Sequence, residues 1–103
     1  MVAFLEEKQA QIADLCRKYG VRRLDVFGSA AVEDQFDSAT SDVDFLVEFD
    51  HTQAMGPADQ YFGLLEDLRH LVGRDVDLIS SRSLRNPYFI KSVHATRRVL
   101  YAS

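Results

Sequence analysis

Three aspartates stand at spacings that suit phosphoryl transfer. Asp42 and Asp44 bracket a valine at the start of an apolar run, and Asp77 has a similar setting further along the chain. Because side chains alternate faces along a strand, Asp42 and Asp44 are expected to point the same way. Two carboxylates on one face repel each other unless a cation lies between them, and Mg²⁺ takes carboxylate oxygens together with substrate phosphates. The three aspartates therefore predict a Mg²⁺ and nucleotide site, with Asp77 as the third carboxylate.

A Gly-Ser pair precedes these aspartates and directly follows a predicted strand over 21–27. A short helix beginning at Ala30 would place the backbone amides of Gly28 and Ser29 at a helix N-terminus, which is an anion site. A glycine lets phosphate oxygens approach the backbone, and a serine hydroxyl adds a hydrogen-bond donor. We therefore expect Gly28 and Ser29 to bind the β and γ phosphates of a nucleoside triphosphate.

The chemistry that these residues suit is nucleotidyl transfer. Two metal ions about 3.5 to 4 Å apart can stabilise the attacking and leaving oxygens together, and such ions need clustered carboxylates. Asp77 supplies the third carboxylate if its strand lies beside the Asp42 strand. Asp75 shares the predicted strand face of Asp77 and is the alternative third ligand.

The elements that must position these residues alternate between helix and strand. Helical spacing of apolar residues, two-residue alternation and turn residues predict them in this order: helix 2–19, strand 21–27, brief helix from 30, strand 42–49, helix 57–72, strand 75–79, and a last helix from Asn86 through Leu100. This order predicts an α/β (α+β) fold, a small mixed sheet with helices packed on it.

Length and composition limit the alternatives. The 103 residues, 47% hydrophobic and 27% charged, predict one small globular domain over 1–103. Cys16 excludes an internal disulfide, and its apolar setting predicts an inert thiol. No apolar run approaches the length of a membrane span, so a cytoplasmic protein is expected. The net charge of -4 argues against tight binding to nucleic acid.

The motifs carry a family resemblance. Gly28-Ser29, followed after twelve residues by Asp42-Val43-Asp44, resembles the Gly-Ser and Asp-x-Asp signature of the DNA polymerase β-like nucleotidyltransferase superfamily. At this length the chain resembles its minimal nucleotidyltransferases. Residues 73–79 are similar to their third-carboxylate strand and residues 84–101 to their closing helix, so the likeness covers nearly the whole chain.

That resemblance implies an activity and a partner. Many minimal nucleotidyltransferases are the antitoxin half of a two-protein system whose toxin is a helical HEPN-domain ribonuclease. The family activity is Mg²⁺-dependent transfer of AMP from ATP to a tyrosine of the toxin. The resemblance thus implies ATP as substrate and a HEPN toxin as partner. One departure concerns the triphosphate, because the family often has an arginine where this chain has Ala30. The cations that could replace it are Arg74, Arg82, Arg85 and Lys91.

Two other functions are compatible with the same residues. The chain could neutralise a partner by docking alone. The absence of an arginine after the Gly-Ser pair favours this hypothesis, and the presence of Asp77 opposes it. It could also modify a small molecule, although such transferases normally carry a second domain for the acceptor. A polymerase fits least, because the chain is acidic and has no room for a nucleic-acid-binding domain.

Overall fold

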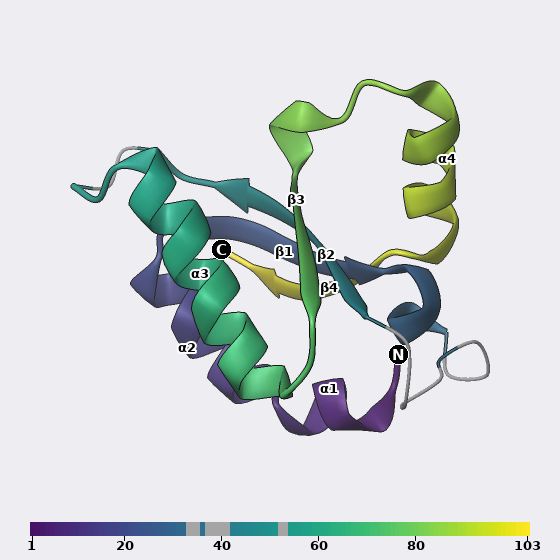
Figure 1. Ribbon diagram of the computed structural model, residues 1–103, viewed down its shortest axis with the longest axis horizontal. Helices are drawn as coiled ribbons and strands as arrows, with labels where there is room; N and C mark the ends of the chain where they lie inside the picture. Colours follow the sequence, from purple (N-terminus) through teal and green to yellow (C-terminus); the bar gives the residue numbers. More distant parts are fainter. Residues whose placement is uncertain (33–35, 37–41, 52–53) are drawn as a thin grey trace.

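The sheet is built from strands whose spatial order differs from their order along the chain. The computed structural model describes residues 1–32, 36, 42–51 and 54–103. Within these residues the strands are β1 (Val21–Phe27), β2 (Val43–Phe49), β3 (Val76–Ser80) and β4 (Arg98–Ala102). They lie in the order β3-β2-β1-β4 (Figure 1). β1 is antiparallel to both β2 and β4, whereas β2 and β3 are parallel, so the sheet is mixed as predicted.

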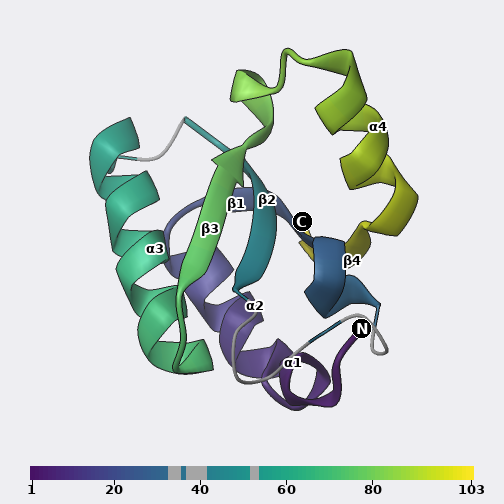
Figure 2. The same ribbon diagram turned by 45° about the vertical axis from the view of Figure 1, so that its right-hand side comes forward.

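Helices lie on both faces of this sheet. The α-helices are α1 (Ala3–Glu7), α2 (Gln9–Lys18), α3 (Pro57–Val72) and α4 (Pro87–Thr96), and the 3₁₀ turns are η1 (Gly28–Ala31) and η3 (Ser81–Ser83). Residues of α1, α2 and α3 pack in one hydrophobic cluster with one face of the sheet, and α4 packs on the opposite face (Figure 2).

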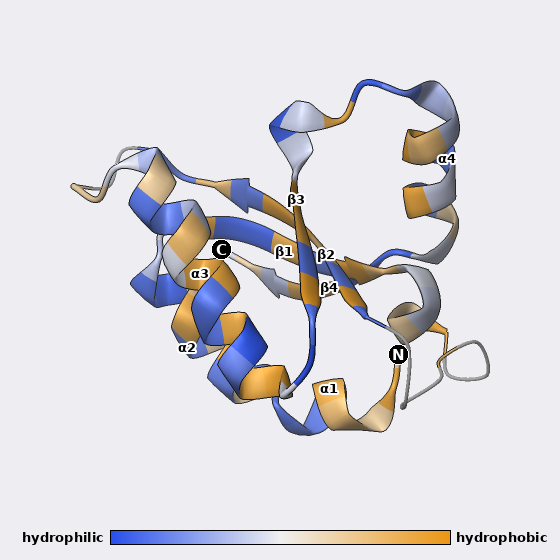
Figure 3. Ribbon diagram, in the orientation of Figure 1, coloured by the Kyte–Doolittle hydropathy of each residue, from blue (hydrophilic) through white to orange (hydrophobic). Residues whose placement is uncertain are grey.

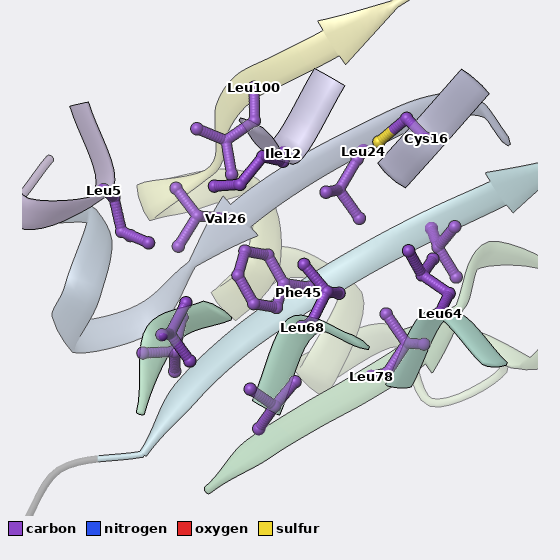
Figure 4. Packing of buried hydrophobic residues seen from close by; sticks show 14 of the residues in the cluster. Leu5, Ile12, Cys16, Leu24, Val26, Phe45, Leu64, Leu68, Leu78 and Leu100 are labelled. Atoms are coloured by element: carbon purple, nitrogen blue, oxygen red, sulfur yellow. The ribbon is translucent and has the colours of Figure 1, made fainter. Parts of the chain in front are cut away.

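The main core lies between the sheet and the first three helices. Val43, Phe45 and Val47 of β2 are fully buried there, which confirms the predicted alternation along this strand. Leu64 and Leu68 of α3 meet them from the helix layer (Figure 4). Hydrophobic and hydrophilic residues alternate along α2 and α3 in Figure 3, as expected for helices with one apolar side.

Local sequence explains both limits of α3 and the start of α4. α3 begins at Pro57, whose fixed φ suits the first helical turn, and is followed by Gly73 with φ of 69°. α4 begins after Asn86, whose side chain accepts hydrogen bonds from the backbone N–H groups of Tyr88 and Phe89. These caps confirm the predicted limits of α3 and the predicted start of α4.

The first predicted helix, 2–19, is wrong in one respect. It is divided into α1 and α2 by a turn at Lys8, and the amide of Lys8 bonds to the carbonyl of Leu5. Leu5, Ile12 and Cys16 are nevertheless all buried, because the turn keeps the apolar residues of both helices on the core side.

The prediction of the last helix is wrong beyond Thr96. That helix was expected to continue through Arg97 to Leu100, but residues Arg98–Ala102 form β4 and pair with β1. The interval between Val93 and Leu100 also fits a helical repeat, so periodicity could not distinguish the two structures. The strand is selected by tertiary contacts, because Leu100 enters the main core from β4.

The fold bears on the predictions for the single cysteine and for membrane-spanning segments. Cys16 is buried, and burial raises the pKa of its thiol to about 12, which agrees with an inert role. Among the described residues, no helix has the length and apolarity needed to cross a membrane.

One glycine of α3 makes room for an aromatic ring. A Cβ placed on Gly63 would lie 2.4 Å from Cε1 of Tyr19 and 2.9 Å from its Cζ. The ring cannot easily move away, because the Tyr19 hydroxyl donates a 2.6 Å hydrogen bond to Asp67 and the side chain is buried. Helix α3 and the end of α2 therefore approach each other through Gly63.

We expect Gly63→Ala to lower the free energy of unfolding by about 1 to 3 kcal/mol, as overpacking does. In most helix interiors the same change is stabilising, by roughly 0.5 to 1 kcal/mol. Urea denaturation of Gly63→Ala in the wild-type and Tyr19→Leu backgrounds measures the difference. With the ring removed, Gly63→Ala should become neutral or stabilising, and an equal loss in both backgrounds would contradict this explanation.

Candidate active site

The register of three strands places two of the predicted aspartates side by side. Asp44 on β2 is paired with Asp77 on β3 and, on its other side, with Phe27 at the end of β1. Asp44 is half-buried, whereas Asp77 is exposed. Asp42 is exposed and lies just before β2 instead of within it. The structure therefore brings Asp44 and Asp77 together in one row across the sheet.

This row lies on the face of the sheet that α4 covers. Leu46 follows Asp44 by two residues, and Ile79 follows Asp77 by two, so each shares the face of its aspartate. Both pack in a second hydrophobic cluster with Phe27 of β1 and Val93 of α4. The aspartates thus lie beside this second hydrophobic cluster and outside the main core.

The three carboxylates influence one another electrostatically. Burial first, and then the negative charges of Asp77 and Asp42, together raise the pKa of Asp44 from its ordinary 3.8 to about 6. Asp42 therefore acts on the same site although it lies outside the strand. Asp75 is not among the groups that shift this pKa, and its exposed side chain precedes β3.

The carboxylates of the site suit the way in which proteins usually bind Mg²⁺. Among the described residues, no three His, Cys, Asp or Glu side chains are arranged closely enough to hold a metal ion by themselves. Mg²⁺ is usually bound by one or two carboxylates together with waters and substrate phosphates instead of an all-protein cage. Asp44 and Asp77, paired and mutually repulsive, fit that mode, with Asp42 adding a third negative charge.

Gly28 allows the backbone to pass close to Asp44. A Cβ on Gly28 would lie 2.8 Å from Oδ2 of Asp44, and its φ of 71° is in the left-handed region that favours glycine. The residue is thus required by both space and conformation. It directly follows Phe27, the β1 partner of Asp44, so the Gly-Ser turn lies beside the row of carboxylates.

The backbone amide of Gly28, predicted to contribute to an anion site, has a partner within the protein. Its N–H donates a 2.8 Å hydrogen bond to Oγ1 of Thr96, the last residue of α4. The brief helix expected from Ala30 is instead the 3₁₀ turn η1, which begins at Gly28 itself. Ser29, the next residue of η1, is partly exposed, and its role at the phosphates stays a prediction.

The position after the Gly-Ser pair points inward. Ala30 is fully buried in the main core, so a long cationic side chain has no place there in this structure. Of the cations considered as replacements, Arg74 has its guanidinium 4.8 Å and 5.0 Å from the ring centres of Phe4 and Phe36. The remaining candidates are all exposed: Arg82 lies on η3, Arg85 between η3 and α4, and Lys91 on α4.

An ion cluster that the sequence analysis missed lies beneath α4. Asp25 of β1 is fully buried, and Arg97, directly after Thr96, contacts Oδ2 of Asp25 through Nε at 2.7 Å and also through Nη2. Nε of Arg23 donates to the other carboxylate oxygen at 3.0 Å. An aspartate inside an apolar strand indicates a buried ion pair. The sequence does not identify the partner, because Arg97 is 72 residues away.

Comparison with protein families matches residues 10–103 to the family "Polymerase beta, Nucleotidyltransferase". Among curated proteins, the chain is similar to "Putative protein adenylyltransferase MJ1379" of Methanocaldococcus jannaschii, with 40% identity over 76 residues, 74% of this chain and 73% of that protein.

Solved structures show the same fold. A "putative minimal nucleotidyltransferase" superposes with a TM-score of 0.71 at 29% identity and covers 91% of this chain and 90% of its own. A complex of a tri-AMPylated Shewanella oneidensis HEPN toxin with its MNT antitoxin has a TM-score of 0.64 at 19% identity, covering 96% of this chain and 73% of the matched one. At 19% identity this second likeness concerns the fold alone.

The raised pKa of Asp44 predicts how stability depends on pH. Its folded-state pKa of about 6 lies above the ordinary value of 3.8, so the folded protein binds more protons than the unfolded chain between these values. In EDTA, the stability contribution of Asp44 should therefore be lost as pH rises from about 4 to about 6. Melting temperatures of wild type and Asp44→Asn across this range provide the test.

The control for this measurement is Asp75→Asn, which removes an exposed carboxylate outside the coupled group. We expect it to keep the pH dependence of the wild type, whereas Asp44→Asn should show a flatter profile. A profile for Asp44→Asn that parallels the wild type would contradict the assignment.

Proposed function

Because this chain belongs to the polymerase β nucleotidyltransferase family, we propose that it transfers AMP from ATP to a protein hydroxyl. The observation that carries the proposal is the row in which Asp44 and Asp77 lie side by side next to Gly28. The curated relative named above as a protein adenylyltransferase supports a protein as acceptor.

In this proposal each part of the site has a separate task. Ser29 binds the β and γ phosphates, and Gly28 lets the triphosphate approach the backbone. Asp42, Asp44 and Asp77 are the catalytic carboxylates and would hold Mg²⁺, two ions in the complete site. When bound, Mg²⁺ neutralises the charge that develops on the phosphate oxygens.

The transfer step is an in-line displacement. The acceptor hydroxyl oxygen bonds to the α-phosphorus of ATP, the bond from that phosphorus to the β-phosphate oxygen breaks, and pyrophosphate leaves. The hydroxyl proton is released to solvent. Asp77 is the exposed member of the row, so it faces an incoming acceptor, while half-buried Asp44 lies against Gly28. No side chain of this protein becomes covalently modified.

We further propose that the acceptor is a tyrosine of a HEPN-domain toxin and that this protein is the antitoxin. The complex with a tri-AMPylated HEPN toxin supports this choice, because its antitoxin shares the fold of this chain. The structure of this chain is consistent with an acceptor supplied in trans, since Asp77 and Asp42 are exposed at the site.

Asp44→Asn and Asp42→Asn should each reduce AMP transfer to a co-expressed cognate HEPN-domain toxin to background, because each removes a negative charge that helps to bind Mg²⁺. Transfer is measured with labelled ATP and Mg²⁺. Asp75→Asn is the matched control and should retain transfer. If the wild type transfers no nucleotide yet binds the toxin, neutralisation by docking would replace this proposal.

The three-carboxylate arrangement also predicts a linkage between ligand and stability. In EDTA, Asp77→Asn should raise the free energy of unfolding by roughly 0.5 to 2 kcal/mol, because one of several like charges is removed. Mg²⁺ with ATP should raise the melting temperature of the wild type, and the gain should be smaller in Asp77→Asn. An Asp77→Asn variant that behaves as the wild type does in both solutions would remove Asp77 from the site.

A further inference from the structure

The last side chain of α4 meets the Gly-Ser turn. Oγ1 of Thr96 accepts the 2.8 Å hydrogen bond from the N–H of Gly28, so its oxygen has a fixed position at the turn. Gly28 in turn lies against the carboxylate of Asp44. Thr96 comes from the far end of the chain, 68 residues from Gly28, and no motif in the sequence marks it.

The hydroxyl of Thr96 retains a proton that it can donate. A hydroxyl can accept and donate at the same time, and a threonine inside a helix often donates to a carbonyl one turn earlier. No such acceptor takes the Thr96 proton among the residues that the structure describes. Thr96 is also partly exposed, so the proton is available to a ligand at the turn.

Positive charge lies close to Thr96 at the end of α4. The carbonyl end of a helix carries partial negative charge, which by itself would repel phosphate. The ion cluster beneath α4 offsets it, because Arg97 and Arg23 contribute two positive charges and Asp25 one negative charge. Arg97 also fixes the end of α4 to β1, so Thr96 has little freedom to move away from Gly28.

We propose that Thr96 is a further nucleotide-binding residue, whose hydroxyl accepts from Gly28 and donates to a phosphate oxygen of the bound triphosphate. This inference rests on the proposed function, because it needs a triphosphate at Gly28 and Ser29. It assigns to Thr96 part of the phosphate contact that an arginine at position 30 cannot make here, since Ala30 is buried.

Isothermal titration calorimetry with MgATP tests this assignment directly. Thr96→Val keeps the shape but removes the hydroxyl, and we expect its Kd to rise by about tenfold, as for the loss of a hydrogen bond to a charged group. Thr96→Ser keeps the hydroxyl and should bind within roughly twofold of the wild type. Ser103→Ala removes a hydroxyl that bonds to the carbonyl of Arg22, at the opposite end of β1, and should leave the Kd unchanged.

Melting temperature distinguishes a variant that has lost binding from one that has lost its fold. Melting temperatures are recorded for all of them, and Thr96→Ala replaces Thr96→Val if the valine variant does not fold. Equal Kd values for the wild type and the hydroxyl-free variant would overturn the inference while leaving the proposed function intact. An equal loss of affinity in Thr96→Ser would also overturn it. Failure of the wild type itself to bind MgATP would overturn both.

Discussion

The register of β2 is the constraint on which the candidate site depends. Phe45 is fully buried in the main core, and this burial fixes which residues of β2 face the other way. A shift of one residue would place Asp44 in the core and Phe45 on the α4 side, which is energetically prohibitive. The same register aligns Asp44 with both Phe27 and Asp77. Packing on one face of the sheet therefore determines the chemistry on the other.

The two faces of the sheet divide stability from function. The face toward α1, α2 and α3 is apolar, whereas the face toward α4 combines a small apolar cluster with carboxylates and a buried ion cluster. Like charges at Asp44 and Asp77 oppose folding in the absence of a cation. The fold tolerates this because the repulsion is confined to an edge of the smaller cluster, away from the large core.

The sequence predicted those parts that depend on local pattern. Alternation along β2 and β3 identified the faces of Asp44 and Asp77, and caps such as Asn86 and Gly73 marked helix ends. The end of α4 could not be predicted, because Leu100 fits helical spacing and only its pairing partner selects a strand. Thr96 was missed for the same reason. Its role follows from a contact with Gly28, which no local pattern reveals.

The pairing of β4 with β1 has a consequence for how the chain folds during its synthesis. Asp25 leaves the ribosome 72 residues before Arg97, so its ion cluster cannot be complete until nearly all the described chain has been made. Until then Asp25 has only Arg23, its neighbour in β1, as a counter-ion, and a carboxylate paired in this incomplete way opposes early burial of the strand. We therefore expect β1 to be fully buried only when Arg97, at the end of α4, is available. Native structure, and with it the turn at Gly28, is completed only as translation of this segment finishes.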